Sequence, residues 1–531
     1  MRSNQGKSNQ ATPFFGKKSR WLLAFLLIIG TTITTGGYWL FTSSSGLHWL
    51  LSTAARSSAG SLSFEGINGT MRAMRIGAIH FTSPDLNLTV QDAELIWQPS
   101  ALLSGELLVN NFSIKNIEVL TLPSSDTPED PELPESLRIP LSISIDQFKI
   151  ATLRVFTKES DEPAFAATKI SARLKSDGQQ HHLPHLAIHL DFGALDASAR
   201  INGDAPFDLK AQVRFIGTTQ WADILPSETN VLATITGNLQ KLGIKVEGQG
   251  AGINGHADAQ LLPFAALPIS TLHLSLDGLN PKTFSEDAPE ANLALRITLN
   301  EEIAGKLAGD LILKNSTIAT LDNGGLPLHE IRTGVALTPK LVELHDLSLL
   351  FADKGRISGN LSWQIEQSSG LADLSVHQLN PLALDTRLRA ARINGSIKLE
   401  GDADAQHGVI ALKDDALRID ANIEHTTEAV TLKKLHLSHG KSQFTGQGKL
   451  DLTDQQPFNF SGDLKRFNLS DFLQAPSSDL NMSLRLAGGL APVAGTVNFK
   501  IDRSQRAHHA VIGNAQIKFN DLNQLKSKVD V

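Results

Sequence analysis

The sequence predicts a protein that is almost entirely β-structure, apart from one N-terminal transmembrane helix and short connecting helices. Three observations predict this fold class. An uncharged stretch follows a basic N-terminus, apolar and polar residues alternate from Ser61 to the end of the chain, and sets of these alternating segments recur. Because successive side chains of a strand point to opposite faces, alternation places one face of each strand in an apolar environment.

The membrane anchor is predicted over residues 21–41, which carry no charge. At about 1.5 Å per residue, a helix of this length spans roughly 30 Å, the hydrocarbon thickness of a bilayer. Residues 1–20 contain five basic and no acidic residues, so we expect them to form a cytoplasmic tail. The anchor is expected to be formed by Trp21, Leu22, Leu23, Phe25, Leu26, Leu27, Ile28, Ile29, Tyr38, Trp39, Leu40 and Phe41.

The alternative interpretation of this stretch is a cleaved signal peptide with an apolar core over residues 21–29. Such a peptide needs a cleavage site of small residues after its core, and no convincing site follows here. In both interpretations the residues after Phe41 lie across the membrane.

The composition of the exported part argues against several classes of function. The whole chain has a net charge of −7 and residues 1–20 hold +5, which leaves −12 for the remainder, so nucleic acid is not an expected partner. The chain has no cysteine, which excludes disulfides and thiol chemistry. The exported residues are too many for one compact core, so several domains or a repeat are expected.

A short amphipathic helix is predicted over residues 42–60, and strands joined by turns are predicted over residues 61–531. One interruption, residues 123–136, contains five acidic residues and four prolines without periodicity, and it is predicted to be an exposed loop. The helix is predicted from four apolar residues at helical spacing: Leu47, Leu50, Leu51 and Ala54.

The strands recur in sets from about residue 180, with a unit of roughly 90–100 residues. Residues 347–379 resemble residues 435–467 at an offset of 88 or 87. Stacked repeats of this kind bury their apolar faces against their neighbours. A short helical step follows each copy and also occurs at two earlier places, so four steps are predicted: residues 379–382, 467–472, 279–284 and 217–225.

The sequence contains no motif that predicts catalytic or metal-binding chemistry. Residues 250–255 spell G-x-G-x-x-G, but the dinucleotide fingerprint needs a helix after its last glycine, and another strand is expected there. His185 and His189 would lie about 13 Å apart on one strand, too far for a shared metal ion. We therefore expect no enzyme activity, no cofactor and no metal, and we expect the four clustered histidines to be solvated: His181, His182, His185 and His189.

A long sheet with one apolar face must have that face covered or used. A second sheet could cover it, a closed solenoid could cover it with its own coils, or the sheet could curl lengthwise into an apolar trough. Composition alone does not choose among these three solutions.

Several motifs in about the first 150 residues resemble the TamB family, within the AsmA-like bridge proteins. After these motifs, strands of the GxLxL type resemble the family in pattern only. The matching motifs are Ser45-Gly46-Leu47 and Leu50-Leu51 after the anchor, residues 64–70 (FEGINGT), residues 95–105 (LIWQPSALLSG), and Leu133-Pro134 leading to Ile139-Pro140-Leu141.

The resemblance implies an elongated, curled sheet (a β-taco) with a lengthwise hydrophobic groove, in the periplasm and held in the bacterial inner membrane by a single pass. It further implies transfer of glycerophospholipids toward the outer membrane, and support of outer-membrane protein assembly and secretion with the barrel protein TamA. The groove is then expected to be lined by Leu86, Leu88, Val90, Leu141, Ile143, Ile145, Leu272, Leu274, Leu276, Leu293, Leu295, Ile297, Leu435, Leu437, Val497 and Phe499.

The chain departs from this family pattern at its C-terminus. Relatives are typically longer and end in a domain that meets the barrel partner, so we expect this chain to be a fragment or a split gene product, without that contact. Two alternatives remain open. One is a structural scaffold or chaperone that offers strand edges to β-barrel proteins. The other, a surface adhesin solenoid, would require loss of the anchor.

Overall fold

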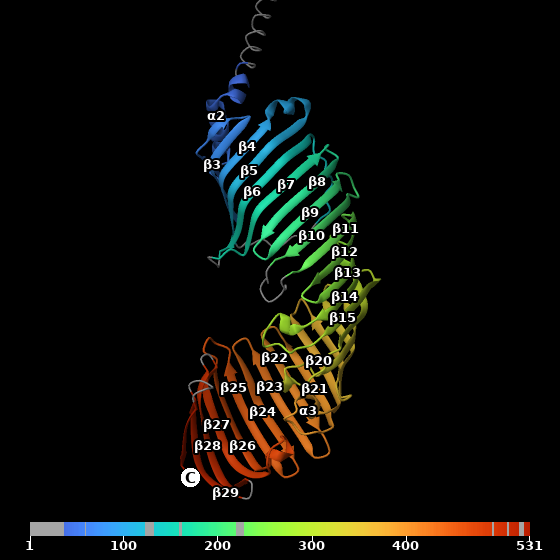
Figure 1. The fold of residues 1–531 in the computed structure, drawn as a ribbon, viewed down its shortest axis with the longest axis vertical. Coiled ribbons are helices and arrows are strands. Elements are labelled where there is room, and N and C mark those ends of the chain that lie inside the picture. The colour runs from blue at the N-terminus through green and yellow to red at the C-terminus, as the bar shows by residue number, and fades with distance from the viewer. Residues whose placement is uncertain are drawn as a thin grey trace, which may run out of the picture. The chain divides into compact units, whose positions relative to one another are not determined.

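The computed structural model describes residues 35, 37–58, 60–122, 132–158, 162–218, 228–490, 493–506, 509–519 and 525–530. These residues belong to two compact units, one within Met1–Glu129 and Pro134–Phe207, and the other within Asp130–Leu133 and Asp208–Val531. Strands dominate both units and helices are few and short, which confirms the predicted all-β class (Figure 1).

Unit 1 is one sheet preceded by a helix. Strands β1 and β2 both pair with β3, and from β3 onward each strand pairs with the next one along the chain. Its elements are α2 Ser44–Ser57, β1 Leu62–Glu65, β2 Asn68–Thr70, β3 Ala73–Thr82, β4 Leu86–Gln98, η1 Pro99–Ser104, β5 Glu106–Thr121, β6 Ser142–Thr157, β7 Phe165–Ser176, β8 Gln180–Leu190 and β9 Gly193–Asn202.

The pair β5–β6 is parallel, whereas the other named pairs of unit 1 are antiparallel. A parallel pair cannot be joined by a hairpin, so the chain must return along the sheet before β6 begins. The returning segment is held by hydrogen bonds from Leu137 N to Gly203 O and from Ile139 N to Gly178 O, both 3.0 Å long. Residues 123–131 of the predicted acidic loop lie outside the described residues.

Unit 2 is a continuous antiparallel meander in which each strand from β10 to β30 pairs with the next. Its elements are β10 Asp208–Gly217, β11 Asn230–Asn238, β12 Lys241–Gly250, β13 Ile253–Leu261, β14 Ile269–Leu279, η2 Pro281–Thr283, β15 Leu293–Ile303, β16 Lys306–Asn315, η3 Leu321–Asn323, β17 Leu328–Leu337, β18 Leu341–Phe351, β19 Arg356–Gln364, β20 Ser369–Leu379, α3 Pro381–Leu384, β21 Ile393–Asp402, β22 Ala405–Lys413, β23 Leu417–Thr426, β24 Ala429–His439, β25 Ser442–Asp451, β26 Pro457–Phe467, η4 Leu469–Asp471, β27 Ser478–Leu490, β28 Val493–Arg506, β29 His509–Phe519 and β30 Leu525–Asp530.

Three of the four predicted helical steps are present, as η2, α3 and η4. They follow β14, β20 and β26, so successive steps are separated by six strands. Most of the fourth step, residues 219–225, lies outside the described residues.

The predicted membrane anchor falls largely outside the described residues, which include only residues 35 and 37–41 of it. Within the described part of the chain, no helix combines the length and the apolar character needed to cross a membrane. Helix α2 lies within the range 42–60 that was predicted to be helical.

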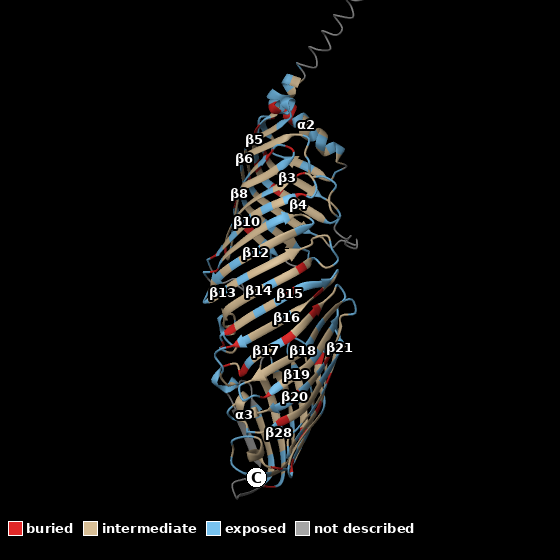
Figure 2. Cartoon of the chain, turned by 90° about the vertical axis from the view of Figure 1, so that its right-hand side faces the viewer, coloured by how far each residue is buried: buried red, intermediate tan, exposed pale blue. Residues whose placement is uncertain are grey.

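Two clusters of buried apolar side chains lie in unit 1. One is built on β4 to β7 around Val90, Ile150 and Ala167. The other joins Leu47 of α2 to Trp97 and Val109 of the sheet. Along most strands, however, half-buried residues predominate (Figure 2).

Candidate functional site: the apolar face of the sheet

One face of unit 2 carries an unbroken row of apolar residues or glycines across twenty strands. The register of each ladder places one residue of the row directly beside the next. From β10 to β29 the row is Phe215, Val231, Gly248, Gly255, Leu276, Leu295, Leu313, Ile331, Leu349, Ile357, Val376, Gly395, Leu412, Ile419, Leu437, Phe444, Leu464, Met482, Ile501 and Gly513.

The opposite face of strands β13 to β29 is polar along the neighbouring row, in which Ile312 and Ala411 are the apolar exceptions. Ion pairs such as Arg296–Asp277 and Lys398–Asp373 lie on these strands, and their exposed positions make them contribute little to stability. From β13 to β29 the polar row is His256, Ser275, Arg296, Ile312, Arg332, Ser348, Ser358, Ser375, Ser396, Ala411, Asp420, His436, Thr445, Asp463, Ser483, Lys500 and Asn514.

The structure brings the ten predicted groove residues of unit 2 to this apolar face. Leu276, Leu295 and Leu437 belong to the row itself. Leu435 and Phe499 share a parallel row through Gly446, Gly462 and Leu484. The others lie two or four positions along the strand from a member of a row, and such residues share a face of the sheet: Leu272, Leu274, Leu293, Ile297 and Val497.

Six predicted groove residues lie in unit 1. Val90 belongs to the β4–β7 cluster and Leu88 packs against it. Ile145 packs against the cluster at α2. Ile143 pairs with Leu107. Leu86, Leu141 and Ile143 are half-buried, and of all sixteen predicted residues only Val90 and Leu293 are buried, at 7% and 6% exposure.

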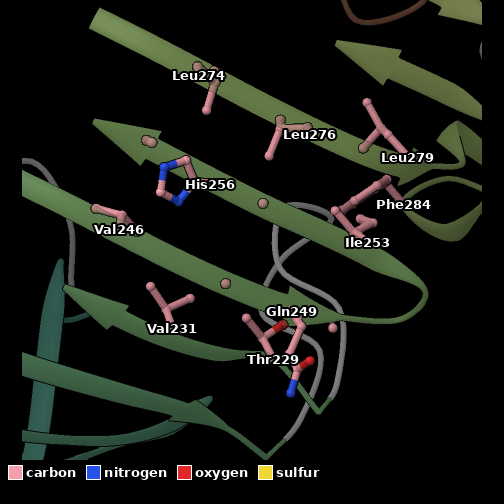
Figure 3. A pocket seen from close by; sticks show the side chains of 14 residues that line it. Thr229, Val231, Val246, Gln249, Ile253, His256, Leu274, Leu276, Leu279 and Phe284 are labelled. Carbon is pink, nitrogen blue, oxygen red and sulfur yellow. The ribbon is translucent and has the colours of Figure 1, made fainter. Parts of the chain in front are cut away.

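A pocket of about 260 Å³ opens in the apolar face of unit 2 at β11 to β14. Room for it exists because the row contains two consecutive glycines there, Gly248 and Gly255, which have no side chain to fill the space between Val231 and Leu276. Figure 3 shows the apolar side chains along these strands, with Phe284 from the helical step at one end.

The three helical steps share one pattern of hydrogen bonds, of which the sequence shows only the asparagine before each step. An asparagine caps each step, and its side-chain oxygen accepts from the backbone two residues on and again about ten residues on. For Asn380 the donors are Leu382 N and Ala391 N, each at 3.3 Å. Asn280 and Asn468 accept equivalent bonds from Lys282 N and Ala291 N, and from Ser470 N and Ser478 N. Each asparagine therefore fixes both ends of its connection.

A strand irregularity precedes each step at the same position. The ladder register shifts before Leu279, Leu379 and Phe467. The residue before each of these has a left-handed backbone, with φ of 80° at Gly278, 48° at Gln378 and 47° at Arg466. Such a bulge bends the end of the strand, so each helical step leaves its strand with the same local geometry.

Near the third step, η4, phenylalanine rings cover the glycines of the apolar face, whereas near the first step, η2, the space over the glycines is an open pocket. Added methyl groups at Gly446 and Gly462 would lie 2.7 Å from the rings of Phe460 and Phe444, respectively, so the rings cover these glycines. Phe467 of β26 stacks on Phe472 with ring centroids 4.8 Å apart. The apolar face is therefore uneven, with a hollow at β11 to β14 and aromatic filling at β25 and β26.

The structure places the G-x-G-x-x-G motif at a turn between two strands. Residues 250–255 form the β12–β13 hairpin, whose turn residues Ala251 and Gly252 have φ of 47° and 83°. Strand β13 follows, so no helix end is available to bind a pyrophosphate, as predicted. In the described ranges, no group of three or more His, Cys, Asp or Glu could hold a metal ion.

The expectation that all four clustered histidines are solvated is wrong for His181. Its ring is half-buried, with Nδ1 2.8 Å from Ser176 Oγ and Nε2 2.8 Å from Leu137 O. Arg138, the next residue of the same segment, forms an ion pair with Asp204 that lowers the pKa of the Asp204 carboxyl. His181 therefore holds the segment that returns to β6. Its partner Leu137 is 44 residues away in the sequence, so strand periodicity could not reveal this role.

Together, the repetitive meander and the continuous apolar face of unit 2 define a class of repetitive β-sheet proteins with one apolar face. A family model described as the N-terminal domain of TamB matches residues 33–155 and 123–503, which is most of the chain. The chain belongs to the TamB family and corresponds to its N-terminal region, which supports a TamB-like role in the translocation and assembly module. No curated protein matches the chain.

Proposed function

We propose that this chain is a membrane-anchored lipid conduit, in which the apolar face forms a lengthwise groove for the acyl chains of glycerophospholipids. Residues 21–41 would hold it in the bacterial inner membrane, with the strands in the periplasm. The chain would carry lipids toward the outer membrane and support outer-membrane protein assembly and secretion, with TamA as a partner.

The observation that carries the proposal is the row from Phe215 to Gly513. An acyl chain lying along such a row meets apolar groups at every strand, at about 4.8 Å intervals. Each methylene removed from water contributes about 0.8 kcal/mol. Because the row has no polar interruption, a lipid could move from one strand to the next without exposing its chains to water.

Photo-crosslinking tests this proposal with matched pairs of positions. A photoreactive amino acid replaces Leu295 or Phe444 on the apolar face, and Thr298 or Thr445 on the polar face of the same strands. We expect phospholipid adducts from the first two positions only. If the apolar positions trapped polypeptide and no lipid, the scaffold or chaperone function would replace the conduit.

A charge in the groove gives an independent test. Leu295→Asp places a carboxylate on the apolar face, where desolvation is costly, whereas Thr298→Asp places it in water. We expect Leu295→Asp to lower the phospholipid that co-purifies with the chain and to impair the cell envelope, and we expect Thr298→Asp to change neither. If no phospholipid co-purified and Leu295→Asp left the envelope intact, the proposal would be wrong.

A further inference from the structure

The turn between β4 and β5 exposes two leucines although its backbone is well fixed. In η1, Leu103 is 93% exposed and Leu102 is 42% exposed, while Ala101 beside them is buried. Gly105 closes the turn with φ of 78° and donates from its N–H to Leu102 O. Its carbonyl accepts from Ser142 N at 2.9 Å, which ties the turn to β6. The turn thus presents large apolar side chains from a fixed support.

Helix α2 lies at the same end of unit 1 as this turn. Trp97, two residues before η1 begins, packs in one buried cluster with Leu47 of α2. The Trp97 indole N–H donates to Met71 O, and the Trp97 backbone N–H donates to Arg72 O, so the end of β4 is held beneath the helix. Figure 1 shows β4 running toward the end of the unit where α2 lies.

The surroundings of the turn favour a lipid leaflet as its partner. Helix α2 begins at Ser44, three residues after the uncharged stretch 21–41, so an anchored chain would place α2 at the membrane surface. Trp49 on α2 is 54% exposed, and tryptophan is the residue type enriched at membrane interfaces. The exposed ionisable groups of α2, of β1 to β4 near this end and of the start of β5 include three acidic residues, one histidine and three arginines, of which the arginines suit anionic headgroups: Glu65, Glu94, Glu106, His48, Arg56, Arg72 and Arg75.

We propose that Leu102 and Leu103 of η1, together with Trp49, insert into the lipid leaflet that holds the anchor. The insertion seats the α2 end of the unit 1 sheet directly on the membrane. This inference rests on the proposed anchoring of residues 21–41, and it adds a second contact with the bilayer, made by a turn of the sheet.

Single cysteines can test the insertion because the natural chain has none. The full chain is reconstituted into vesicles of phosphatidylethanolamine and phosphatidylglycerol, and an environment-sensitive fluorophore is attached to Leu103→Cys. Phe165→Cys is the matched control, because Phe165 is an exposed apolar residue of unit 1 at the opposite end of the strands. Trp39→Cys reports on the anchor itself.

We expect the fluorophore at positions 103 and 39 to shift its emission to the blue and to be quenched by spin labels on the lipid headgroups. At position 165 we expect neither effect. Quenching at 39 without quenching at 103 would overturn the insertion while leaving the anchor intact. Loss of both would overturn the insertion and the anchoring together. A blue shift at 103 without lipid quenching would show a protein contact and would also overturn the proposal.

A second variant separates insertion from simple proximity. With the fluorophore at Trp49→Cys, Leu103→Asp is expected to weaken the lipid quenching, because a charge does not enter the leaflet and the anchor alone then holds α2 near the membrane. Leu371→Asp, at an exposed leucine of unit 2, is the control and should leave the quenching unchanged. Unchanged quenching in Leu103→Asp would contradict the proposed role of the turn.

Discussion

The two units follow the same alternating pattern but bury their apolar faces to different degrees. In unit 1, Val90, Ile150 and Ala167 are buried in one cluster, and α2 covers a second cluster through Leu47. In unit 2, Val376 of the central row is buried, but the other large members of the row, such as Leu295 and Leu437, are half-buried, and a pocket opens beside Gly255. Alternation therefore fixes which face is apolar, whereas covering elements and glycine positions decide whether that face becomes a core or stays accessible.

The largest effect in this comparison is expected from Leu47→Ala. Leu47 is fully buried, so its truncation should destabilise the α2 end of unit 1 by about 2–5 kcal/mol. Leu437→Ala in unit 2 should cost no more than about half as much, because a half-buried leucine loses less apolar contact. Native-state hydrogen exchange of amides near each site measures both effects. Equal costs at the two sites would contradict the difference between the units.

A smaller effect is expected from enlarging an alanine in each unit. Ala167→Leu overpacks the unit 1 cluster, where Ala167 is 1% exposed, and should cost about 1–3 kcal/mol. Ala257→Leu extends into the pocket of unit 2 and should cost close to nothing. The same exchange measurement checks both variants. A clear destabilisation by Ala257→Leu would show that the pocket is not open space.

The sequence was sufficient to predict the strand pattern, the apolar face and three of the helical steps, because these features depend on local periodicity. Leu276 and Leu437, predicted from alternation, lie in one continuous row. The role of His181 and the second bond of each capping asparagine depend on residues that are distant along the chain. The pocket at Gly255 depends on which residues become neighbours across strands, and that register is not visible in a single strand.

The helical steps of unit 2 allow a third prediction. Asn380→Ala removes the acceptor for Leu382 N and Ala391 N, and loss of a helix cap of this kind should cost about 0.5–2 kcal/mol. We expect faster hydrogen exchange at these two amides and little change in unit 1. Asn380→Asp keeps an acceptor but loses the bond that Asn380 Nδ2 donates to Asp353 at 2.6 Å and sets two carboxylates side by side, so it should restore protection only in part. Asn459→Ala, at an exposed asparagine of β26, serves as the control.

The smallest effect is expected from acidic pH, which should weaken the contact between Thr386 and Asp322 in unit 2. Thr386 donates its hydroxyl and its backbone N–H to the Asp322 carboxylate, and these bonds lower the pKa of Asp322 from its ordinary value of 3.8 to about 2. A carboxyl whose pKa is lowered in the folded state stabilises the fold at pH values above its unfolded pKa, and this contribution disappears as the pH falls through the folded pKa.

The contact between Thr386 and Asp322 should therefore be intact above about pH 4 and should be lost progressively toward about pH 2. Hydrogen exchange of the Thr386 amide, corrected for the intrinsic effect of pH, measures the loss. Asp322→Asn keeps an oxygen acceptor but cannot titrate, so the pH dependence should vanish in this variant. If the dependence persisted in Asp322→Asn, another carboxyl such as the neighbouring Asp385 would be the group that titrates, because its pKa is also lowered by its bonds to Arg387.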